Sequence, residues 1–424
     1  MQSNRRTKRK LDKELRRKIE RILKIQGETV MKILVVCQHY YPEPFRITDI
    51  CEEWVKRGHE VTVVAGLPNY PEGKIYNGYK GKAGTEEMIC GVRVHRCFEI
   101  ARRSGIVFRL LNYYSFAWSS KRYIKKMKEK FDVVFANQLS PIMMVNGAVA
   151  YKKKHGTKLV MYSLDLWPES LVVGGIRRGS LVYKYFHRLS KKIYSQADKL
   201  LFSSKQFREY FKKEFQIEDA KMEYLPQYAE TLFAVDSCRK EQSETIDLLF
   251  AGNIGAAQSV ETIIRAAAET QDIENLRWHI VGEGSSLSAC QALAMELNVK
   301  SVTFYGRKPL EEMPAFYKKA DAMLVTLMDD DVLSLTLPGK VQTYMAAGKP
   351  IIAASNGEIA TILQDSKCGF CVSAENYIEL AQKVREFCQL SEEKRADLGK
   401  KAREFYEDNF DKETFFKKVE ELFV

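Results

Sequence analysis

The sequence lacks any long apolar run, which limits what the chain can be. No window of its 424 residues approaches the ~18 consecutive apolar residues that a membrane-spanning helix needs. Residues 1–30 are basic rather than apolar, so we expect no signal peptide there. The nine cysteines are scattered and odd in number, which is typical of a protein in a reducing compartment. The composition therefore predicts a cytoplasmic protein.

Signatures of several enzyme classes are missing as well. No Walker lysine motif occurs anywhere in the chain. The first strand-like run, Lys32–Cys37, continues into QHYYPEPFR without a glycine, which argues against a dinucleotide-binding dehydrogenase. Cys368 and Cys371 form a single CxxC with no second pair and no nearby histidine, so we expect no metal site.

Positive charge is concentrated in the first half. The formal net charge is +12, but residues 1–230 hold 45 Lys and Arg against 24 Asp and Glu, whereas residues 231–424 hold 22 against 31. A strongly basic half suggests an anionic partner surface, either nucleic acid or the cytoplasmic leaflet of a membrane. No recognised nucleic-acid-binding motif is present, so we expect an anionic membrane surface and no nucleic acid.

The alternation of short apolar runs with helical stretches predicts an α/β fold. Alternation of this kind builds doubly wound, Rossmann-like domains that bind ligands at the carboxyl ends of their strands. Two such series follow one another, so two domains facing a central cleft are expected. The predicted strands are Lys32–Cys37, Glu60–Ala65, Val92–Arg96, Asp132–Ala136, Leu159–Tyr162, Lys199–Ser203, Met222–Leu225, Ile246–Phe250, Trp278–Val281, Val302–Tyr305, Ala322–Thr326 and Pro350–Ala353.

Shifts in composition suggest domain limits. Residues 1–30 are a basic extension, and residues 31–228 form the acceptor or membrane-facing domain. The polar stretch 229–245 is a candidate linker, and residues 246–404 form the donor domain. A C-terminal helix over about 405–424 is expected to pack back on the first domain.

A glycine loop follows the first strand of the second half. The motif FAGNIG places Gly252 and Gly255 between that strand and a helix expected from about Ser259. Glycines let backbone amides approach a phosphate, and a helix N-terminus favours an anion. A tight turn without a ligand would use the same residues, so this motif alone does not distinguish a phosphate-binding loop from an ordinary turn.

A second helix start carries hydroxyls and a lysine. The stretch SLTLPGK precedes a helix expected over Val341–Ala347. Such groups at a helix start can hold phosphate or sugar hydroxyls, although an ordinary capped helix remains the alternative. The candidate donor-binding residues here are Ser334, Thr336, Pro338, Gly339 and Lys340.

The first half holds a segment suited to a membrane interface. Residues 106–118 read IVFRLLNYYSFAW, and the basic run KRYIKKMKEK follows. An apolar, aromatic segment followed by cations fits an interfacial anchor, and a core helix with a solvated end is the alternative. The candidate membrane residues are Phe108, Tyr113, Phe116, Trp118, Lys121 and Arg122.

Polar residues at predicted strand ends of the first half are acceptor-side candidates. They are His39, Arg46, Asn137, Asp165 and Glu169. The two carboxylates lie in LDLWPES, where each could equally cap or brace a helix.

Longer motifs carry a family resemblance. FAGNIG, VGEGS, YGRKPLEEMPAFYKKADAMLV and LPGKVQTYMAAGKPII occur in the order seen in family 4 glycosyltransferases. Upstream, YYPEPFRITDI, GLPNYPEGK and DLWPES resemble the branch that builds O-antigen and capsular polysaccharide. The resemblance covers about residues 31–424 and implies a GT-B fold, retention of anomeric configuration and no catalytic metal.

The resemblance also implies site roles. The loop Gly252–Gly255 is similar to the loop that meets the donor diphosphate, and Gly306 and Arg307 to the segment that holds the base. Lys340 matches a position near the phosphates, and Glu358 a donor-side carboxylate. With Asp165, these last two are the catalytic candidates.

The sequence departs from the family at four positions. Asn253 and Gln258 stand where the family usually has arginine and lysine, and Leu335 and Thr343 stand where it has two glutamates. Either the ribose is bound through another group, or activity is lost. Because LPGK and AAGKP are intact, we favour altered binding, with the diphosphate relying on Lys340 and backbone amides.

These observations predict a retaining glycosyltransferase at the inner face of the cell membrane. It would move an N-acetylated hexose or deoxyhexose from a nucleotide sugar, expected to be UDP-linked, to a saccharide on undecaprenyl diphosphate or a similar lipid. No cofactor is expected. A sugar-nucleotide epimerase of GT-B fold and a non-catalytic sugar-nucleotide-binding partner remain as alternatives.

Overall fold

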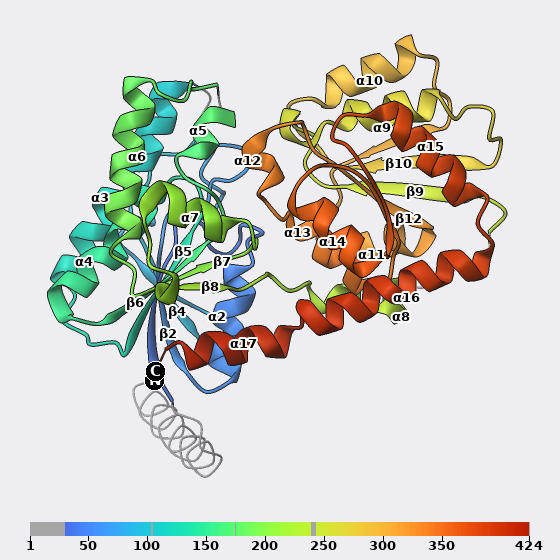
Figure 1. The fold of residues 1–424 in the computed structure, drawn as a ribbon. Coiled ribbons are helices and arrows are strands. Elements are labelled where there is room, and N and C mark those ends of the chain that lie inside the picture. Colours follow the sequence, from blue (N-terminus) through green and yellow to red (C-terminus); the bar gives the residue numbers. More distant parts are fainter. Residues whose placement is uncertain (1–29, 103–104, 174, 239–242, 424) are drawn as a thin grey trace. The chain divides into compact units, whose positions relative to one another are not determined.

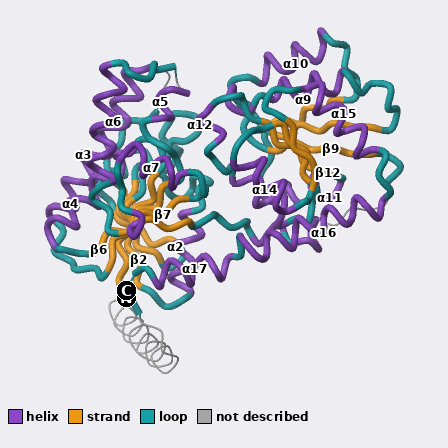
Figure 2. Tube along the Cα trace, in the orientation of Figure 1, coloured by secondary structure: helices purple, strands orange, loops and turns teal. Residues whose placement is uncertain are grey.

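The computed structural model describes residues 30–102, 105–173, 175–238 and 243–423. The chain forms two compact units, each built on its own sheet with helices packed against it (Figures 1 and 2). The predicted pair of Rossmann-like α/β domains is therefore confirmed. The basic extension lies outside the described residues except for residue 30.

The first unit contains an eight-stranded sheet. Its order is β3-β4-β2-β1-β5-β6-β7-β8, and the strands from β4 to β6 pair in parallel. The edge strand β3 pairs antiparallel with β4 and was not predicted from the sequence. The strands are β1 (Lys32–Val36), β2 (Glu60–Ala65), β3 (Glu86–Ile89), β4 (Val92–Arg96), β5 (Val133–Gln138), β6 (Lys158–Ser163), β7 (Lys199–Phe202) and β8 (Met222–Tyr224).

Helices follow the strands of this unit in alternation. Buried β-branched and aromatic residues make the central strands apolar on both faces, as parallel strands covered on two sides require. Helix α3 packs against α4. The helices are α2 (Ile47–Lys56), α3 (Ile106–Lys126), α4 (Asn146–His155), α5 (Glu169–Val173), α6 (Leu181–Tyr194) and α7 (Phe207–Phe215).

The second unit contains a six-stranded parallel sheet in the order β11-β10-β9-β12-β13-β14. Alternate residues of its central strand enter two different cores. Leu248 and Phe250 join one core, whereas Leu249 and Ala251 join the other, because successive side chains of a strand point to opposite faces. The strands are β9 (Ile246–Ala251), β10 (Leu276–Val281), β11 (Val302–Gly306), β12 (Ala322–Thr326), β13 (Ile351–Ala354) and β14 (Gly369–Val372).

Helices on the two faces of this sheet complete those cores. Helices α9, α10 and α15 supply one core, and α11, α13, α14 and α16 supply the other. The helices of this unit are α8 (Val235–Cys238), α9 (Val260–Ala268), α10 (Leu287–Glu296), α11 (Met313–Lys319), α12 (Asp331–Ser334), α13 (Gly339–Ala346), α14 (Glu358–Ser366), α15 (Tyr377–Cys388), α16 (Glu392–Asn409) and α17 (Lys412–Glu421).

The limits of the two units differ in detail from those expected. The second unit takes in residues 202–210 and everything described from Tyr224 to Glu421, so the stretch expected as a linker belongs to it. Helices α16 and α17 also belong to the second unit, and only the last residues return to the first. There the ring of Phe423 lies 5.4 Å from that of Trp54.

Candidate functional site

Loops after neighbouring strands of the second unit meet at the carboxyl edge of its sheet. Gly252 and Gly282 have φ angles of +147° and +148°. A Cβ added to Gly282 would lie 1.8 Å from the carbonyl oxygen of Gly252, and one added to Gly284 would lie 2.2 Å from that of Ile254. The N–H of Gly252 donates to the carbonyl of Val281 at 2.9 Å. The glycines therefore permit direct backbone packing, which fixes the path of the 252–255 loop.

Lys340 lies beside this loop in the first turn of α13. Its Nζ is 4.0 Å from the centre of the Phe250 ring and 2.9 Å from the place that a Cβ would occupy on Gly252. Among the described residues it forms neither an ion pair nor a hydrogen bond through Nζ. Burial lowers the pKa of Lys340 from 10.5 to about 7. An anion bound next to Gly252 would restore the charge.

Tyr344 holds helix and strand together one turn further along α13. Its hydroxyl donates to the carbonyl of Ala251 at 3.0 Å and accepts the N–H of Ala251 at 3.1 Å. Tyr344 is fully buried, and its i, i+4 spacing from Lys340 puts both residues on one face of the helix. Tyr344 was not among the residues predicted from the sequence, although its spacing from Lys340 was visible there.

Asn253 and Gln258 stabilise the glycine loop. The Asn253 side-chain amide donates to Oε1 of Gln258 at 2.9 Å, and the N–H of Gly255 donates to the same oxygen at 3.3 Å. Two neutral side chains thus stand at the positions where the family resemblance predicts cations. Lys340 lies next to this loop, beside Gly252.

The hydroxyl candidates of the second motif form local hydrogen bonds. Ser334 and Thr336 donate to carbonyls three residues earlier, those of Asp331 and Leu333. Thr343 donates to the carbonyl of Gly339 at 3.1 Å, within its own helix. Pro338 is the N-cap residue of α13. These bonds are local to the end of α12 and to α13, so the donor-binding roles of these hydroxyls stay predictions.

The segment expected to hold the base lies next to the glycine loops. Gly306 ends β11, and its carbonyl accepts the N–H of Gly282 at 2.9 Å. The Nε of Arg307 lies 3.4 Å from Oε2 of Glu283, and both side chains are about half exposed. The ends of β9, β10 and β11 therefore present Gly252, Gly282 and Gly306 side by side.

Glu358 is buried at the start of α14. It is 2% exposed, and its Oε1 accepts the N–H of Lys205 at 3.1 Å. Burial raises the pKa of its carboxyl above the ordinary value. The carboxylate therefore binds backbone just before α7, in the 202–210 segment that is assigned to the second unit.

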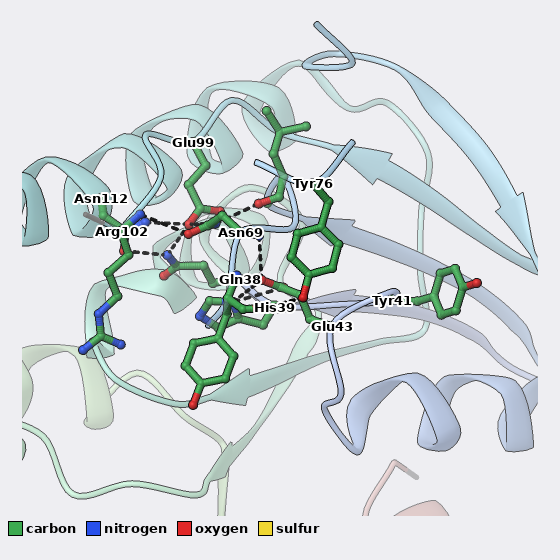
Figure 3. A network of polar contacts seen from close by, with 12 residues as sticks. Gln38, His39, Tyr41, Glu43, Asn69, Tyr76, Glu99, Arg102 and Asn112 are labelled. Carbon is green, nitrogen blue, oxygen red and sulfur yellow. Dashed lines mark hydrogen bonds and ion pairs between the residues drawn. The ribbon is translucent and has the colours of Figure 1, made fainter. Parts of the chain in front are cut away.

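A buried polar network lies in the first unit around Glu99 (Figure 3). Its Oε1 accepts hydrogen bonds from the side-chain amides of Gln38 at 2.7 Å, Asn69 at 3.0 Å and Asn112 at 2.7 Å. Its Oε2 is buried and has no hydrogen-bond partner among the described residues. Burial raises the pKa of Glu99 to about 7, against the opposing effect of His39. The sequence analysis missed this residue, because its partners are far apart along the chain.

His39 contacts a second buried carboxylate in the same region, that of Glu43. The Nδ1 atom of His39 lies 3.1 Å from Oε2 of Glu43, and both side chains are buried. Oε1 of Glu43 also accepts the N–H of Asn69 at 2.8 Å and of Tyr70 at 2.6 Å. The histidine is therefore held in a network that fixes the loop after β2.

The other acceptor-side candidates lie near strand ends of the first unit. Arg46 is the N-cap residue of α2, and Asn137 is buried near the end of β5. Oδ2 of Asp165 accepts the Ser170 hydroxyl at 2.6 Å, and burial raises the pKa of Asp165.

The carboxylate of Glu169 is hydrogen-bonded to other side chains of the first unit. It is 2% exposed, its Oε2 accepts two hydrogen bonds from Arg178, and its Oε1 accepts the Tyr183 hydroxyl at 2.6 Å. These bonds tie α5 to α6, which matches the alternative that this carboxylate stabilises a helix.

The interfacial segment forms the helix α3, and two of its candidate membrane residues were wrongly chosen. Tyr113 and Phe116 are 6% and 0% exposed, because they lie on the face of α3 that packs into the unit. Phe108 and Trp118 are exposed, and the guanidinium of Arg122 lies 5.4 Å from the Trp118 ring. Lys121 is also exposed.

None of the described helices is both long enough and apolar enough to cross a membrane. In the same residues, no group of three or more His, Cys, Asp or Glu side chains is placed to hold a metal ion.

Family models match both halves of the chain. Residues 45–227 match the glycosyl transferase 4-like domain, and residues 238–405 match the glycosyl transferases group 1.

Two curated relatives are glycosyltransferases by name. One, WbjE of Pseudomonas aeruginosa, is 27% identical over 249 residues, which are 55% of this chain and 61% of that protein. The other, WcaI of Escherichia coli K12, is named for colanic acid biosynthesis and is 24% identical over 406 residues, covering 90% of this chain and 97% of that protein.

Solved structures share the fold. A sucrose-phosphate synthase from Thermosynechococcus elongatus matches with a TM-score of 0.70 at 15% identity, covering 92% of this chain and 98% of that one. The Anabaena protein HepE, solved in complex with UDP and glucose, matches with a TM-score of 0.66 at 14% identity, covering 92% and 99%. The predicted GT-B fold is thereby confirmed.

The backbone packing of the glycine loops can be tested by adding one methyl group. We expect Gly282→Ala to weaken the binding of UDP about tenfold or more, because its Cβ would displace the Gly252 carbonyl and shift the loop. Isothermal titration calorimetry measures the effect. Gly156→Ala is the matched control, since Gly156 also has a positive φ of +72° but open space around it. Unchanged affinity in Gly282→Ala would contradict the role of this loop.

Proposed function

Because the chain consists of the two domains of a GT-B glycosyltransferase, we propose that it transfers a hexose from a UDP-linked donor to a lipid-linked saccharide. Cell-surface polysaccharide biosynthesis is the proposed setting, as the names of WcaI and WbjE suggest for those proteins. Retention of configuration and independence from metal are part of the proposal and rest on the family resemblance. The UDP complexes of HepE support the choice of nucleotide.

The observation that carries this proposal is the position of Lys340 beside Gly252. Transfer breaks the bond between the anomeric carbon and a phosphate oxygen, so negative charge develops on the departing diphosphate. A lysine that lies in a partly buried place, with no counter-ion among the residues that the structure describes, is preorganised to stabilise that charge. Backbone N–H groups of the 252–255 loop would supply further donors.

The missing glutamates do not argue against turnover in this arrangement. Thr343 occupies one of the two positions and bonds within its helix, so ribose recognition must come from another group. The diphosphate part of the site keeps its lysine and its glycine loops. Since models of glycosyltransferase domains match both units, transfer is a better proposal than epimerisation or a purely structural role.

The acceptor is proposed to bind the first unit. This unit carries the excess of positive charge and holds the buried network of His39, Glu43 and Glu99 at the ends of its strands. Asp165 is a candidate for contact with an acceptor hydroxyl. A lipid-linked acceptor would also explain the exposed aromatic side chains of α3.

We further propose that α3 rests on the anionic inner face of the cell membrane. Phe108, Leu111, Tyr114 and Trp118 are 39%, 44%, 41% and 59% exposed and follow one stripe of the helix. Lysines and an arginine follow at its C-terminal end. An aromatic stripe ending in cations suits the boundary between headgroups and acyl chains.

Turnover is the direct test of the proposed transfer. Wild-type protein should release UDP from UDP-sugars faster when a lipid-linked saccharide is present, and Lys340→Ala should lower kcat about 100-fold or more, since the leaving group loses its cation. Coupled detection of UDP measures both. Lys319→Ala, at an exposed lysine of the same unit, should turn over normally. Equal rates in Lys340→Ala and the wild type would refute the role of Lys340.

Membrane association can be tested by flotation with vesicles. The double variant Leu111→Ser/Trp118→Ser should bind vesicles containing 30% phosphatidylglycerol about tenfold more weakly than wild type, because two exposed apolar side chains are lost. Met88→Ser, at a residue that is 63% exposed on the edge strand β3, is the control and should bind normally. If all three proteins float equally, α3 is not the anchor.

A further inference from the structure

A cavity of about 1480 Å³ opens in the first unit beside the Glu99 network. Two chain segments supply most of its lining, the stretch 71–77 after β2 and the stretch Phe98–Arg102 after β4. Lys80 and Phe108 complete it. None of the sequence-predicted acceptor residues lines this cavity, so it is a site that the sequence did not suggest.

Three cations line the cavity. They are Lys74, Lys80 and Arg102, and none of them forms an ion pair within the described part of the chain. Figure 3 shows the guanidinium of Arg102 pointing away from the Glu99 carboxylate. Arg102 also lowers the pKa of Asp165 through space, although burial outweighs it. The lining therefore carries three cations against the exposed carboxylate of Glu72, and one of these cations, Arg102, acts electrostatically on Asp165.

Apolar side chains also line this cavity. Phe98 and Phe108 are 49% and 39% exposed, and Ile100 belongs to the same lining segment as Phe98. Ile100 also lines a neighbouring cavity of about 570 Å³, whose lining includes Leu111 and Trp118 of α3. The two cavities thus share Ile100 in their linings, which connects the apolar residues of the larger cavity with the exposed stripe of α3, and exposed apolar surface of this kind indicates a binding function.

The polar network fixes the shape of the cavity. Asn69 donates to Glu99 and accepts the N–H of Arg102 through Oδ1 at 3.0 Å. The Tyr76 hydroxyl donates to the carbonyl of Tyr70 at 2.6 Å, which closes the 70–76 loop. The two segments that line the cavity are therefore connected through the side chain of Asn69, which contacts both Glu99 and the backbone of Arg102.

We propose that this cavity binds the diphosphate and the adjoining hydrocarbon of a lipid-linked acceptor, with Lys74, Lys80 and Arg102 neutralising the phosphates. The hydrocarbon would lie on Phe98, Ile100 and Phe108 and leave along α3. Neither a diphosphate alone nor a hydrocarbon alone explains the lining, because free pyrophosphate needs no apolar side chains and a hydrocarbon needs no cations. This inference rests on the proposed function, since it names the acceptor of that reaction.

Glu99 acts here as a positioning residue. Its Oε1 accepts three N–H groups, one from each of three chain segments, and its Oε2 lies where a Cβ on Gly66 would be 1.8 Å away. Glu99→Gln keeps an acceptor oxygen for the three donors, so it should preserve binding. Glu99→Ala removes that oxygen and should weaken binding even though all three cations remain.

Farnesyl diphosphate is a suitable probe, with farnesol and inorganic pyrophosphate as its two halves. We expect the intact probe to bind the full-length protein at least tenfold more tightly than either half. Arg102→Ala should weaken its binding about tenfold, and Lys74→Ala/Lys80→Ala, at exposed positions that cannot disturb a core, by a similar factor. Lys130→Ala, an exposed lysine outside the cavity, is the matched control.

Several outcomes would overturn the site. The first is equal affinity of the protein for farnesyl diphosphate and for pyrophosphate. The second is normal affinity for farnesyl diphosphate in both cation variants. The third is displacement of farnesyl diphosphate by phosphatidylglycerol vesicles that is as strong in these variants as in wild type. Equal weakening in Lys130→Ala would reduce the effect to general surface charge and would also overturn it.

Failure of the proposed function would look different. UDP binding by calorimetry should be unchanged in Arg102→Ala, because this residue belongs to the first unit. If the binding of farnesyl diphosphate depends on Arg102 but no UDP-sugar is turned over, the cavity proposal is supported and the proposed transfer reaction is refuted. If transfer at a limiting concentration of lipid-linked saccharide is normal in both cation variants, the cavity proposal is refuted and the transfer reaction stands.

Discussion

The ammonium group of Lys340 lies against the backbone of Gly252 and the face of Phe250, in a place that lowers its pKa to about 7. A lysine held in this way is costly to charge until an anion arrives. The residues around the ammonium group fix its surroundings. Gly282 allows its backbone to pack directly against that of Gly252, and Tyr344 fixes α13 to the end of β9. The structure thereby stabilises the place that we propose for the diphosphate, in the absence of the two glutamates and the two further cations of the family pattern.

The first unit organises its strand ends in a different way. The buried carboxylate of Glu99 accepts hydrogen bonds from side-chain amides of three distant segments. A second carboxylate, that of Glu43, holds His39 and the loop after β2. Buried polar groups that are nearly all hydrogen-bonded specify one arrangement of a region. Loops that line a cavity with exposed cations and aromatic rings need such support, because their surface side chains contribute little packing of their own.

Much of this could be predicted from local pattern. Apolar runs separated by helical stretches identified both sheets, and the motif after β9 identified the loop beside Lys340. The strands β3 and β14 were missed, because EEMI and GFCV are short, partly exposed edge strands with little hydrophobic contrast. Tyr113 and Phe116 were misassigned because an aromatic stretch does not show which face of a helix is buried. Glu99 was missed because Gln38, Asn69 and Asn112 lie 61, 30 and 13 residues away, and no local spacing reports such contacts.

The pKa of Lys340 is the most direct test of this account. It can be measured by NMR on protein carrying ¹³C-labelled lysine side chains, with Lys340→Arg used to assign the signal. The account predicts a pKa near 7 in the free protein, so that the side chain is charged below that pH and neutral above it, and a pKa returned toward 10.5 when UDP is bound. A pKa near 10.5 without UDP, or one that UDP does not raise, would contradict it.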